Sequence, residues 1–381
     1  MTLVFVPKEG RAAETRAAAT PESVKRLKKV GLEVAVEPGL GAGAFFADAA
    51  FTAAGATLTD AAQGWSTADI VLKVGPPSAE EVGRMKSGAL LVGLLAPHRH
   101  PEIARALAER QVTSIAMELV PRISRAQSMD ALSSQANIAG YRAVLLAAFR
   151  LPKYMPLLMT AAGTIPPARV VILGAGVAGL QAIATARRLG AVVEVSDVRP
   201  AVKEQVESLG GKFLEVPVTE SGEGAGGYAR EMSPEYLEKQ RQLVTQHLKA
   251  ADAAISTALV PGKPAPRLIT RDMVEAMRPG AVIVDLAAEQ GGNCELSQAD
   301  REVVHNGVVI LAPTNLAAGM PADASLLYAR NLVALLLPMI KDGALQVDPE
   351  DEVVKGALLT HRGEVVHGPT AQRLAAPAAS S

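Results

Sequence analysis

The sequence contains a single cysteine, Cys294, among its 381 residues. One cysteine excludes an internal disulfide framework and leaves too few thiolates for a zinc ribbon, so we expect no metal site of that kind. Scarce cysteine is typical of proteins from a reducing compartment. Cys294 follows Gly291 and Gly292 in an expected turn, and no base is adjacent to it in the sequence. We therefore interpret Cys294 as a structural residue.

The sequence also lacks an excess of charge of either sign. Its 38 lysines and arginines balance 39 aspartates and glutamates, which gives a formal net charge of −1. No run of basic residues interleaved with aromatic ones occurs. These features argue against nucleic acid as a partner.

Long apolar runs are missing as well. The longest apolar block near the end, residues 332–340, contains Pro338 and is far shorter than the roughly 20 residues that span a bilayer. The N-terminal segment MTLVFVPKEG begins with an expected strand and lacks the basic region and apolar stretch of a secretory signal. We expect a soluble cytoplasmic chain with no membrane span of its own.

A dinucleotide-binding motif lies at residues 170–197, VVILGAGVAGLQAIATARRLGAVVEVSD. The apolar residues 170–173 predict a buried strand, and Gly174 permits the sharp turn that follows. Gly176 lets the main chain approach a pyrophosphate, and Gly179 lets the next helix pack closely on the strand. The phosphates are expected at the helix N-terminus, where free N–H groups and the peptide dipoles favour anions.

Asp197 ends the second strand of this motif. Its carboxylate can accept both ribose hydroxyls of an adenosine, and its charge repels a 2′-phosphate, which favours NAD(H) over NADP(H). Arg199 lies close enough to partner such a phosphate, so the preference is not absolute. A second glycine cluster, Gly39, Gly41 and Gly43, has no clear helix after it. We interpret that cluster as a structural loop, with a phosphate site as the alternative.

Short apolar segments alternate with helical patterns along the whole chain, which predicts parallel sheets covered by helices on both faces. The length and the 49% of hydrophobic residues suit two domains. The helix after Thr20 has an N-cap, Pro21 at its first position and Gly31 just beyond its end. The expected strands are residues 3–6, 32–36, 70–74, 90–94 and 112–116 in the first half and 253–256, 281–284 and 308–311 in the second.

Two long helical patterns, residues 131–149 and the segment after Asn315, are expected to connect the domains. The fold class is therefore α/β, with two Rossmann-like doubly wound parallel-sheet domains joined by long helices. The N-terminal domain comprises residues 1–132 and 318–381 and is discontinuous. Residues 133–317 form the NAD(H)-binding domain, which includes the connecting helix. The tail after Pro369 is expected to be disordered.

Several segments resemble one family over almost the whole chain. They are PKE near the N-terminus, ETRAAATPESV, HGPT near the end, RISRAQSMD at 122–130, GAGVAGLQA at 174–182, GGYAREM at 226–232 and TALVPGKPAP at 257–266. The sequence is similar to the NAD(H)-binding subunits of proton-translocating NAD(P) transhydrogenases, which are related to alanine dehydrogenase. The resemblance implies a homodimer in which each chain has two Rossmann-like domains with NAD(H) in the cleft between them.

The resemblance also implies which residues form the site. Arg122, Gln127, Asp130 and Ser133 correspond to a loop that positions the nicotinamide ring; Arg122 and Asp130 can form a charge-assisted pair, and the Gln127 amide can bond a carboxamide or ribose. Without the resemblance, a solvated loop that caps the next helix is the alternative. Tyr228 corresponds to a tyrosine on a glycine-rich loop that closes over the nucleotide; an ordinary surface loop is the alternative. The expected cofactor-binding residues are Gly174, Gly176, Val177, Ala178, Gly179, Asp197, Val198, Arg199, Gly227, Thr257, Ala258 and Leu259.

Comparison with alanine dehydrogenase separates two possible activities, because an amino-acid dehydrogenase moves a proton as well as a hydride and needs an acid/base. Arg16 and Lys73 match the substrate-binding arginine and lysine of that relative, and we expect them to form core ion pairs here. Leu95 aligns with the catalytic histidine, and Glu289 replaces an expected acid. A shifted alignment brings in His98 or His100, although this pair is more typical of a helix start.

The sequence thus supports an NAD(H)-binding transhydrogenase subunit of the Re/Si-specific, proton-translocating type. NADP(H) is then held by a partner domain, and membrane proton-channel subunits complete the complex at the inner face of the plasma membrane. The main alternative is a self-contained dehydrogenase of the alanine type. A third possibility is a non-catalytic protein that responds to NAD(H).

Overall fold

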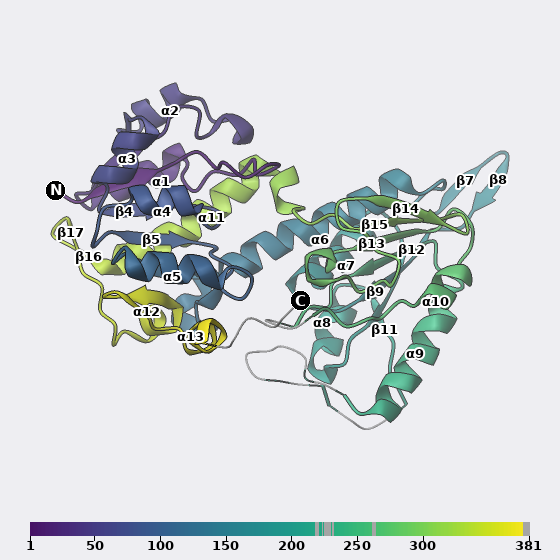
Figure 1. Cartoon of the computed structure of the whole chain (residues 1–381). Helices are drawn as coiled ribbons and strands as arrows, with labels where there is room; N and C mark the ends of the chain where they lie inside the picture. The colour runs from purple at the N-terminus through teal and green to yellow at the C-terminus, as the bar shows by residue number, and fades with distance from the viewer. Residues whose placement is uncertain (218–220, 223, 225–229, 231, 261–263, 376–381) are drawn as a thin grey trace. The chain divides into compact units, whose positions relative to one another are not determined.

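The computed structural model describes residues 1–217, 221, 222, 224, 230, 232–260 and 264–375. The expected site residues Gly227 and Tyr228 lie outside the described residues. The chain divides into unit 1, residues 1–135 and 318–381, and unit 2, residues 136–317. Helix α6 (Ala131–Arg150) carries the first crossing between the units, slightly beyond the division expected after residue 132 (Figure 1).

Unit 1 is built on an eight-stranded sheet with the order β19-β18-β6-β5-β4-β1-β2-β3. Strands β1 to β6 pair in parallel, whereas β18 pairs antiparallel with β6 and β19. The strands are β1 (Leu3–Val6), β2 (Glu33–Val36), β3 (Thr57–Leu58), β4 (Ile70–Leu72), β5 (Leu90–Gly93), β6 (Thr113–Ala116), β18 (Leu358–His361) and β19 (Glu364–Val365).

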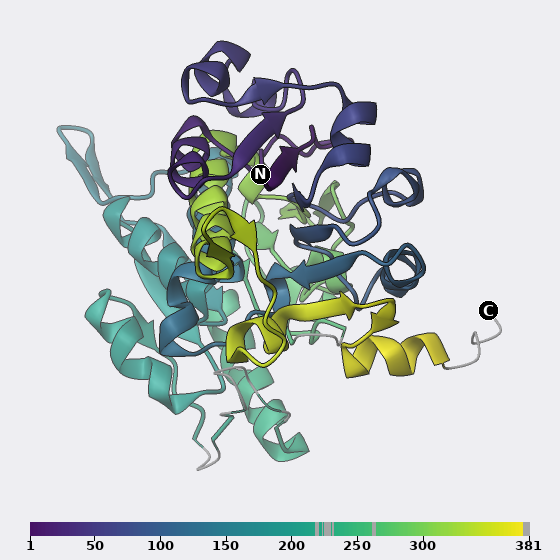
Figure 2. The ribbon, with the colours of Figure 1, turned by 90° about the vertical axis from the view of Figure 1, so that its left-hand side faces the viewer.

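Helices cover both faces of this sheet, as the alternation of buried residues along the strands requires. Val4 and Val6 of β1 pack in one apolar cluster with α1 and α11, whereas Phe5 between them packs in another with α3, α4 and α5 (Figure 2). The helices are α1 (Pro21–Lys29), α2 (Asp48–Ala53), α3 (Ala61–Thr67), α4 (Ala79–Arg84), α5 (Pro101–Glu109), α11 (Pro321–Leu336), α12 (Glu352–Ala357) and α13 (Gly368–Ala375).

Unit 2 has a seven-stranded sheet with the order β11-β10-β9-β12-β13-β15-β14. All neighbours are parallel except the pair β14 and β15. The strands are β9 (Arg169–Leu173), β10 (Val192–Ser196), β11 (Lys212–Phe213), β12 (Ala253–Ser256), β13 (Val282–Asp285), β14 (Glu302–His305) and β15 (Val308–Leu311). The order reverses at β9 and β12, which is the topological switch point where open α/β sheets bind ligands.

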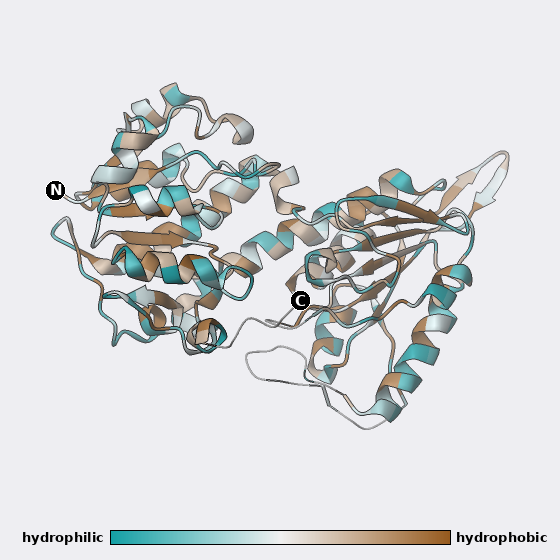
Figure 3. Ribbon diagram, in the orientation of Figure 1, coloured by the Kyte–Doolittle hydropathy of each residue, from teal (hydrophilic) through white to brown (hydrophobic). Residues whose placement is uncertain are grey.

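The helices of unit 2 are α7 (Val177–Arg188), α8 (Lys203–Ser208), α9 (Pro234–Leu248) and α10 (Arg271–Glu275), together with most of α6. The strands are hydrophobic along their length, and α9 alternates hydrophilic and hydrophobic residues (Figure 3). This pattern matches a sheet buried on both faces under amphipathic helices.

The α/β class with two mostly parallel sheets is confirmed. Several local expectations are wrong. Residues 370–375, expected in a disordered tail, belong to α13 (Gly368–Ala375), which packs on α5. The antiparallel strands β14, β18 and β19 were not predicted, nor was the hairpin of β7 (Leu158–Thr160) and β8 (Gly163–Ile165). The helix after Asn315 is shorter than predicted, because a 3-10 turn, residues 317–319, and Met320 precede α11.

Candidate functional site

The carboxyl ends of β9 and β12 form the centre of the candidate nucleotide site. Gly174 has a φ of 101°, and a Cβ there would lie 2.7 Å from Thr257 Oγ1. A Cβ on Gly179 would lie 1.9 Å from the carbonyl oxygen of Gly174. Both positions therefore require glycine, for the turn and for the close approach of α7 to β9.

Gly176 has a different environment, because nothing lies within 4 Å of a Cβ placed on it. It is the N-cap of α7 and provides no side-chain cap for the first turn. The amides of Val177 and Ala178 belong to that turn, where N–H groups have no partner within the helix. Open space in front of an uncapped helix N-terminus suits the phosphates of a dinucleotide.

The Thr257 to Leu259 segment after β12 is fixed by two side chains. The Thr257 hydroxyl donates to the Gly174 carbonyl oxygen over 3.0 Å. The fully buried Asn293 accepts from the Ala258 N–H over 3.1 Å and donates to the Ala258 and Pro266 carbonyl oxygens over 2.9 and 2.8 Å. Asn293 thus orders the segment opposite Gly174. The sequence interpretation missed its role, because these contacts join residues far apart in the chain.

Asp197 lies at the end of β10 and is 8% exposed. Its carboxylate accepts the Ala175 N–H over 2.7 Å, which ties β10 to the glycine turn. Its other bonds come from Arg199, whose backbone N–H and Nε donate over 2.9 Å and whose Nη2 donates over 2.7 Å. In this conformation the guanidinium covers the carboxylate expected to hold the ribose. A ribose that binds Asp197 must therefore displace part of this fork.

Val198 anchors the start of the glycine-rich loop. The Gly222 N–H donates to the Val198 carbonyl oxygen over 2.9 Å, and a Cβ on Gly222 would lie 2.6 Å from that oxygen. Arg230 donates from its N–H to the Gly222 carbonyl oxygen over 2.9 Å. The two described ends of the loop thus meet beside Val198, next to Asp197 and the carboxyl end of β10.

The polar loop of unit 1 is a 3-10 segment, Ser124–Met129, followed by Asp130 and α6. We expected Asp130 to pair with Arg122. Instead, the hydrogen bonds of its carboxylate within the described chain join Ser133, from the backbone N–H over 2.8 Å and from the hydroxyl over 2.6 Å. The reason is local, since a carboxylate at a helix start meets the N–H three residues on. Gln127 and Arg122 are exposed.

The expected core ion pairs of unit 1 are confirmed. Arg16 donates to Glu14 through Nε and Nη2 over 2.8 and 2.7 Å. Lys73 is 1% exposed and pairs with Glu9 and Glu81 over 3.3 and 3.2 Å. Both cations are already neutralised by carboxylates, so a substrate carboxylate would have to compete with fixed charges.

No acid/base group stands at the position aligned with the catalytic histidine. Leu95 is buried in the apolar cluster with α3, α4 and α5. Glu118 accepts the N–H groups of Leu95 and Ala96, and burial raises the pKa of its carboxyl group. His100 immediately precedes α5 and its ring bonds Glu102, so the helix-start interpretation of this histidine is confirmed.

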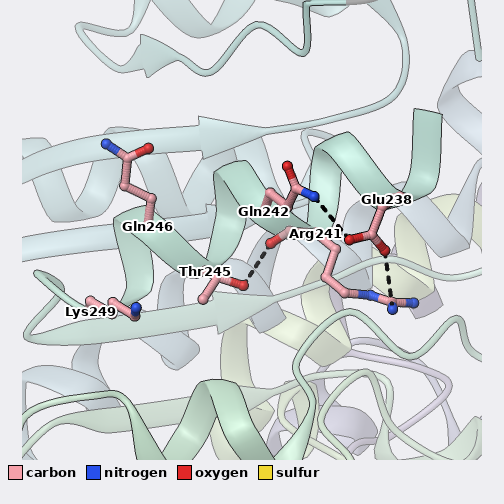
Figure 4. A pocket seen from close by; sticks show the side chains of 6 residues that line it. All are labelled: Glu238, Arg241, Gln242, Thr245, Gln246 and Lys249. Atoms are coloured by element: carbon pink, nitrogen blue, oxygen red, sulfur yellow. Dashed lines mark hydrogen bonds and ion pairs between the residues drawn. The ribbon is translucent and has the colours of Figure 1, made fainter. Parts of the chain in front are cut away.

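Cys294 and a hollow on the surface of α9 add no residues to the candidate site. Cys294 is buried, and desolvation raises the pKa of its thiol to about 11, as expected for a structural residue. No cluster of metal-ligating side chains occurs among the residues that the structure describes. A shallow hollow on α9 is lined by polar residues, among which Arg241 and Gln242 bond Glu238, and it includes none of the expected site residues (Figure 4). These residues are Glu238, Arg241, Gln242, Thr245, Gln246 and Lys249.

Two α/β units, one with a complete glycine turn at its switch point, define a protein of the dinucleotide-binding α/β class. Family models agree: residues 5–139 match the alanine dehydrogenase/PNT N-terminal domain, and residues 143–368 match the C-terminal domain. The chain therefore belongs to the alanine dehydrogenase/PNT family, on its NAD(P) transhydrogenase alpha-subunit branch.

Individual relatives place it on that branch. The chain is 52% identical over 374 residues to an NAD(P) transhydrogenase alpha subunit of Rhodospirillum rubrum, covering 96% of this chain and 97% of the relative. It is 30% identical to an alanine dehydrogenase of Staphylococcus saprophyticus, over 98% and 96%. A transhydrogenase crystal structure from Sinorhizobium meliloti matches with a TM-score of 0.88 and 49% identity, over 96% of this chain and all of that one.

Proposed function

We propose that this chain is the NAD(H)-binding component of a proton-translocating NAD(P) transhydrogenase. It delivers the hydride of NADH to NADP⁺ held by a separate partner domain. One combination of features carries the proposal. The glycine turn at the carboxyl ends of β9 and β12, which we call the nucleotide edge, is complete on unit 2. Leu95, in contrast, is buried where the dehydrogenase relative has its acid/base. Transfer between two nicotinamide rings moves no proton, so the protein's main task is to place the two C4 atoms about 3–3.5 Å apart.

The residues of unit 2 bind the cofactor in this proposal. The turn at Gly174 and Gly176 and the amides of Val177 and Ala178 receive the pyrophosphate. Asp197 accepts the adenosine ribose hydroxyls once the Arg199 fork opens. Thr257, Ala258 and Leu259 flank the turn, and Gly179 keeps α7 close to β9. Val198 anchors the glycine-rich loop whose Gly227 and Tyr228 are proposed to close over the bound nucleotide.

The polar loop of unit 1 is proposed to orient the nicotinamide. Gln127 offers an amide that both donates to and accepts from a carboxamide. Arg122 adds a charged donor. Asp130 keeps its carboxylate on Ser133 at the start of α6, so these two residues hold the end of the loop.

The self-contained alanine-type dehydrogenase is the second candidate, and three structural observations weigh against it. Arg16 and Lys73 are neutralised by Glu14, Glu9 and Glu81. Leu95 offers no ionisable group. A third candidate, a non-catalytic NAD(H)-responsive protein, shares the nucleotide edge and is distinguished only by the absence of hydride transfer.

The experiment measures NADH consumption by the purified chain under two conditions. One contains NADP⁺ and a separately prepared NADP(H)-binding domain of a transhydrogenase. The other contains pyruvate and ammonium. Consumption only with the partner domain supports the proposal, consumption with pyruvate establishes the dehydrogenase, and NADH binding without consumption establishes the third candidate.

The proposal implies partners beyond the NADP(H)-binding domain. No helix within the described part of the chain is long and apolar enough to cross a membrane. Proton movement then belongs to membrane subunits, and we propose that the chain binds to them at the cytoplasmic face of the plasma membrane. Co-purification of the chain with membranes that contain these subunits, and its release without them, tests this.

We also propose that the chain forms a homodimer. The hairpin of β7 and β8 extends from unit 2 (Figure 1) and exposes apolar side chains, with Met159 75% and Ile165 41% exposed. An exposed apolar surface of this kind is typical of an interface. Light scattering after chromatography tests the dimer, and Met159→Lys is expected to weaken it.

A further inference from the structure

Four polar side chains in unit 1 form one connected series of hydrogen bonds that ends on the polar loop. Arg16, held by Glu14, donates from Nη1 to Gln135 Oε1 over 2.9 Å. Gln135 donates from Nε2 to Ser134 Oγ over 3.2 Å. Ser134 donates to Asn331 Oδ1 over 2.7 Å, and Asn331 donates from Nδ2 to the Ser128 carbonyl oxygen over 2.8 Å.

All bonds of this series run in the same direction, from the arginine towards the loop. Gln135 and Asn331 each accept at their oxygen and donate at their nitrogen. A flipped Gln135 amide would set its NH₂ group against Arg16 and would lose its second bond, to the Ala324 carbonyl oxygen over 3.1 Å. Both amides are 8% exposed, so water does not substitute readily for their partners. A buried chain of aligned donors strengthens each of its members.

The last acceptor of the series, the Ser128 carbonyl oxygen, belongs to the polar loop itself. Ser128 follows Gln127 directly and comes two residues before Asp130. Asn331 lies on α11, so a single amide side chain joins this helix to both the loop and the first turn of α6 through Ser134. The arginine that the dehydrogenase relative uses for substrate is thereby connected to the loop proposed to orient the nicotinamide.

We propose that Arg16, Gln135 and Asn331 are positioning residues for hydride transfer, because they fix the backbone of the polar loop through the Ser128 carbonyl. This inference rests on the proposed function. It gives the buried Arg16–Glu14 pair a role other than binding a substrate carboxylate. Small displacements of a positioning loop reduce the rate of the chemical step more than they reduce binding.

The test uses Gln135→Met and Asn331→Leu, which remove links of the series and leave the Arg16–Glu14 pair in place. Ser114→Ala is the matched control, because the Ser114 hydroxyl bonds Thr360 over 2.6 Å, fully buried between β6 and β18. Two quantities are measured on each full-length variant. The first is amide hydrogen exchange over residues 124–130, and the second is the single-turnover rate of hydride transfer with the NADP(H)-binding partner, together with the NADH dissociation constant.

Both variants are expected to speed exchange in the loop about fivefold to tenfold, as loss of one buried hydrogen bond predicts. The hydride-transfer rate is expected to fall about tenfold or more, with the NADH dissociation constant changed less than about threefold. The double variant is expected to be no slower than the worse single variant, because the two residues act in series. Ser114→Ala is expected to change none of these.

Unchanged loop exchange in both variants, or a rate loss that Ser114→Ala shares, overturns the inference. Additive rate losses in the double variant also contradict a series. If the wild-type chain transfers no hydride to the partner, the proposed function fails and the catalytic part of the inference fails with it. Loop exchange then still decides whether the series holds the loop.

Discussion

Replacement of Asn293 tests how the nucleotide edge of unit 2 is held together. Its side chain makes three buried hydrogen bonds, to the N–H and carbonyl oxygen of Ala258 and to the carbonyl oxygen of Pro266. At about 1 kcal/mol for each bond, Asn293→Ala lowers the free energy of unfolding by about 3 kcal/mol. For a unit of this size that corresponds to a fall in Tm of about 6–12 °C.

The same change also loosens the segment that faces the glycine turn. Thr257 and Ala258 lie beside Gly174, where a ligand must find its partners already in place. We expect the dissociation constant of NADH to rise about tenfold, equivalent to about 1.4 kcal/mol of ordering free energy. Titration of NADH fluorescence at a temperature well below the variant's Tm measures this, and differential scanning calorimetry measures the stability.

Ser297→Ala is the matched control, because Ser297 lies near Asn293 in the chain and donates to buried Asp285 over 2.6 Å without touching the segment. It is expected to lower Tm and leave NADH binding unchanged. Two results refute the reasoning: Asn293→Ala that binds NADH like the wild type, or a control that weakens binding equally.

Three further outcomes follow from the same structure. Asp197→Ser is expected to weaken NADH binding and to improve NADPH binding relative to it by about tenfold or more, since the change removes the negative charge that repels a 2′-phosphate; competitive titration with both cofactors checks the ratio. Leu95→His is expected to give no pyruvate reduction, because Arg16 and Lys73 remain paired with carboxylates and a histidine at position 95 is buried among apolar groups. Consumption of NADH by this variant in the presence of pyruvate and ammonium would contradict the prediction. Arg125 holds the pKa of Asp351 at about 2, below its ordinary value, so this pair contributes stability above about pH 4 that is lost as the pH falls towards 2. Urea unfolding measured across this pH range should show the loss of stability in the wild type and a smaller loss in Arg125→Met.

Elements whose defining residues lie close together in the sequence could be predicted from it. Thr20 caps α1, as predicted, because its hydroxyl accepts the Ser23 N–H three residues away. The strand, turn and helix around Gly174 follow from a pattern that is complete within 28 residues. Such features depend on neighbours along the chain, so composition and spacing predict them well.

Features that depend on distant partners were missed. The sequence gives no sign that Asn293 holds the segment after β12, because its partners lie about 30 residues away and come into contact with it only in the folded chain. Strand β18 pairs with β6, its neighbour in the sheet but far from it in the sequence, and α13 packs on α5. Neither element can therefore be predicted from its own residues alone. The Arg122–Asp130 pair was wrong for the opposite reason: a nearer partner, Ser133, takes the carboxylate.

The central claim is direct hydride transfer without a protein proton carrier, and an isotope measurement tests it most directly. NADH that carries deuterium at the transferred position of C4 is mixed with the chain, the NADP(H)-binding partner domain and NADP⁺ in ordinary water. The account predicts that the deuterium appears in NADPH with no loss to solvent. Deuterium found in alanine after addition of pyruvate and ammonium, or NADPH that has gained hydrogen from water, would contradict it.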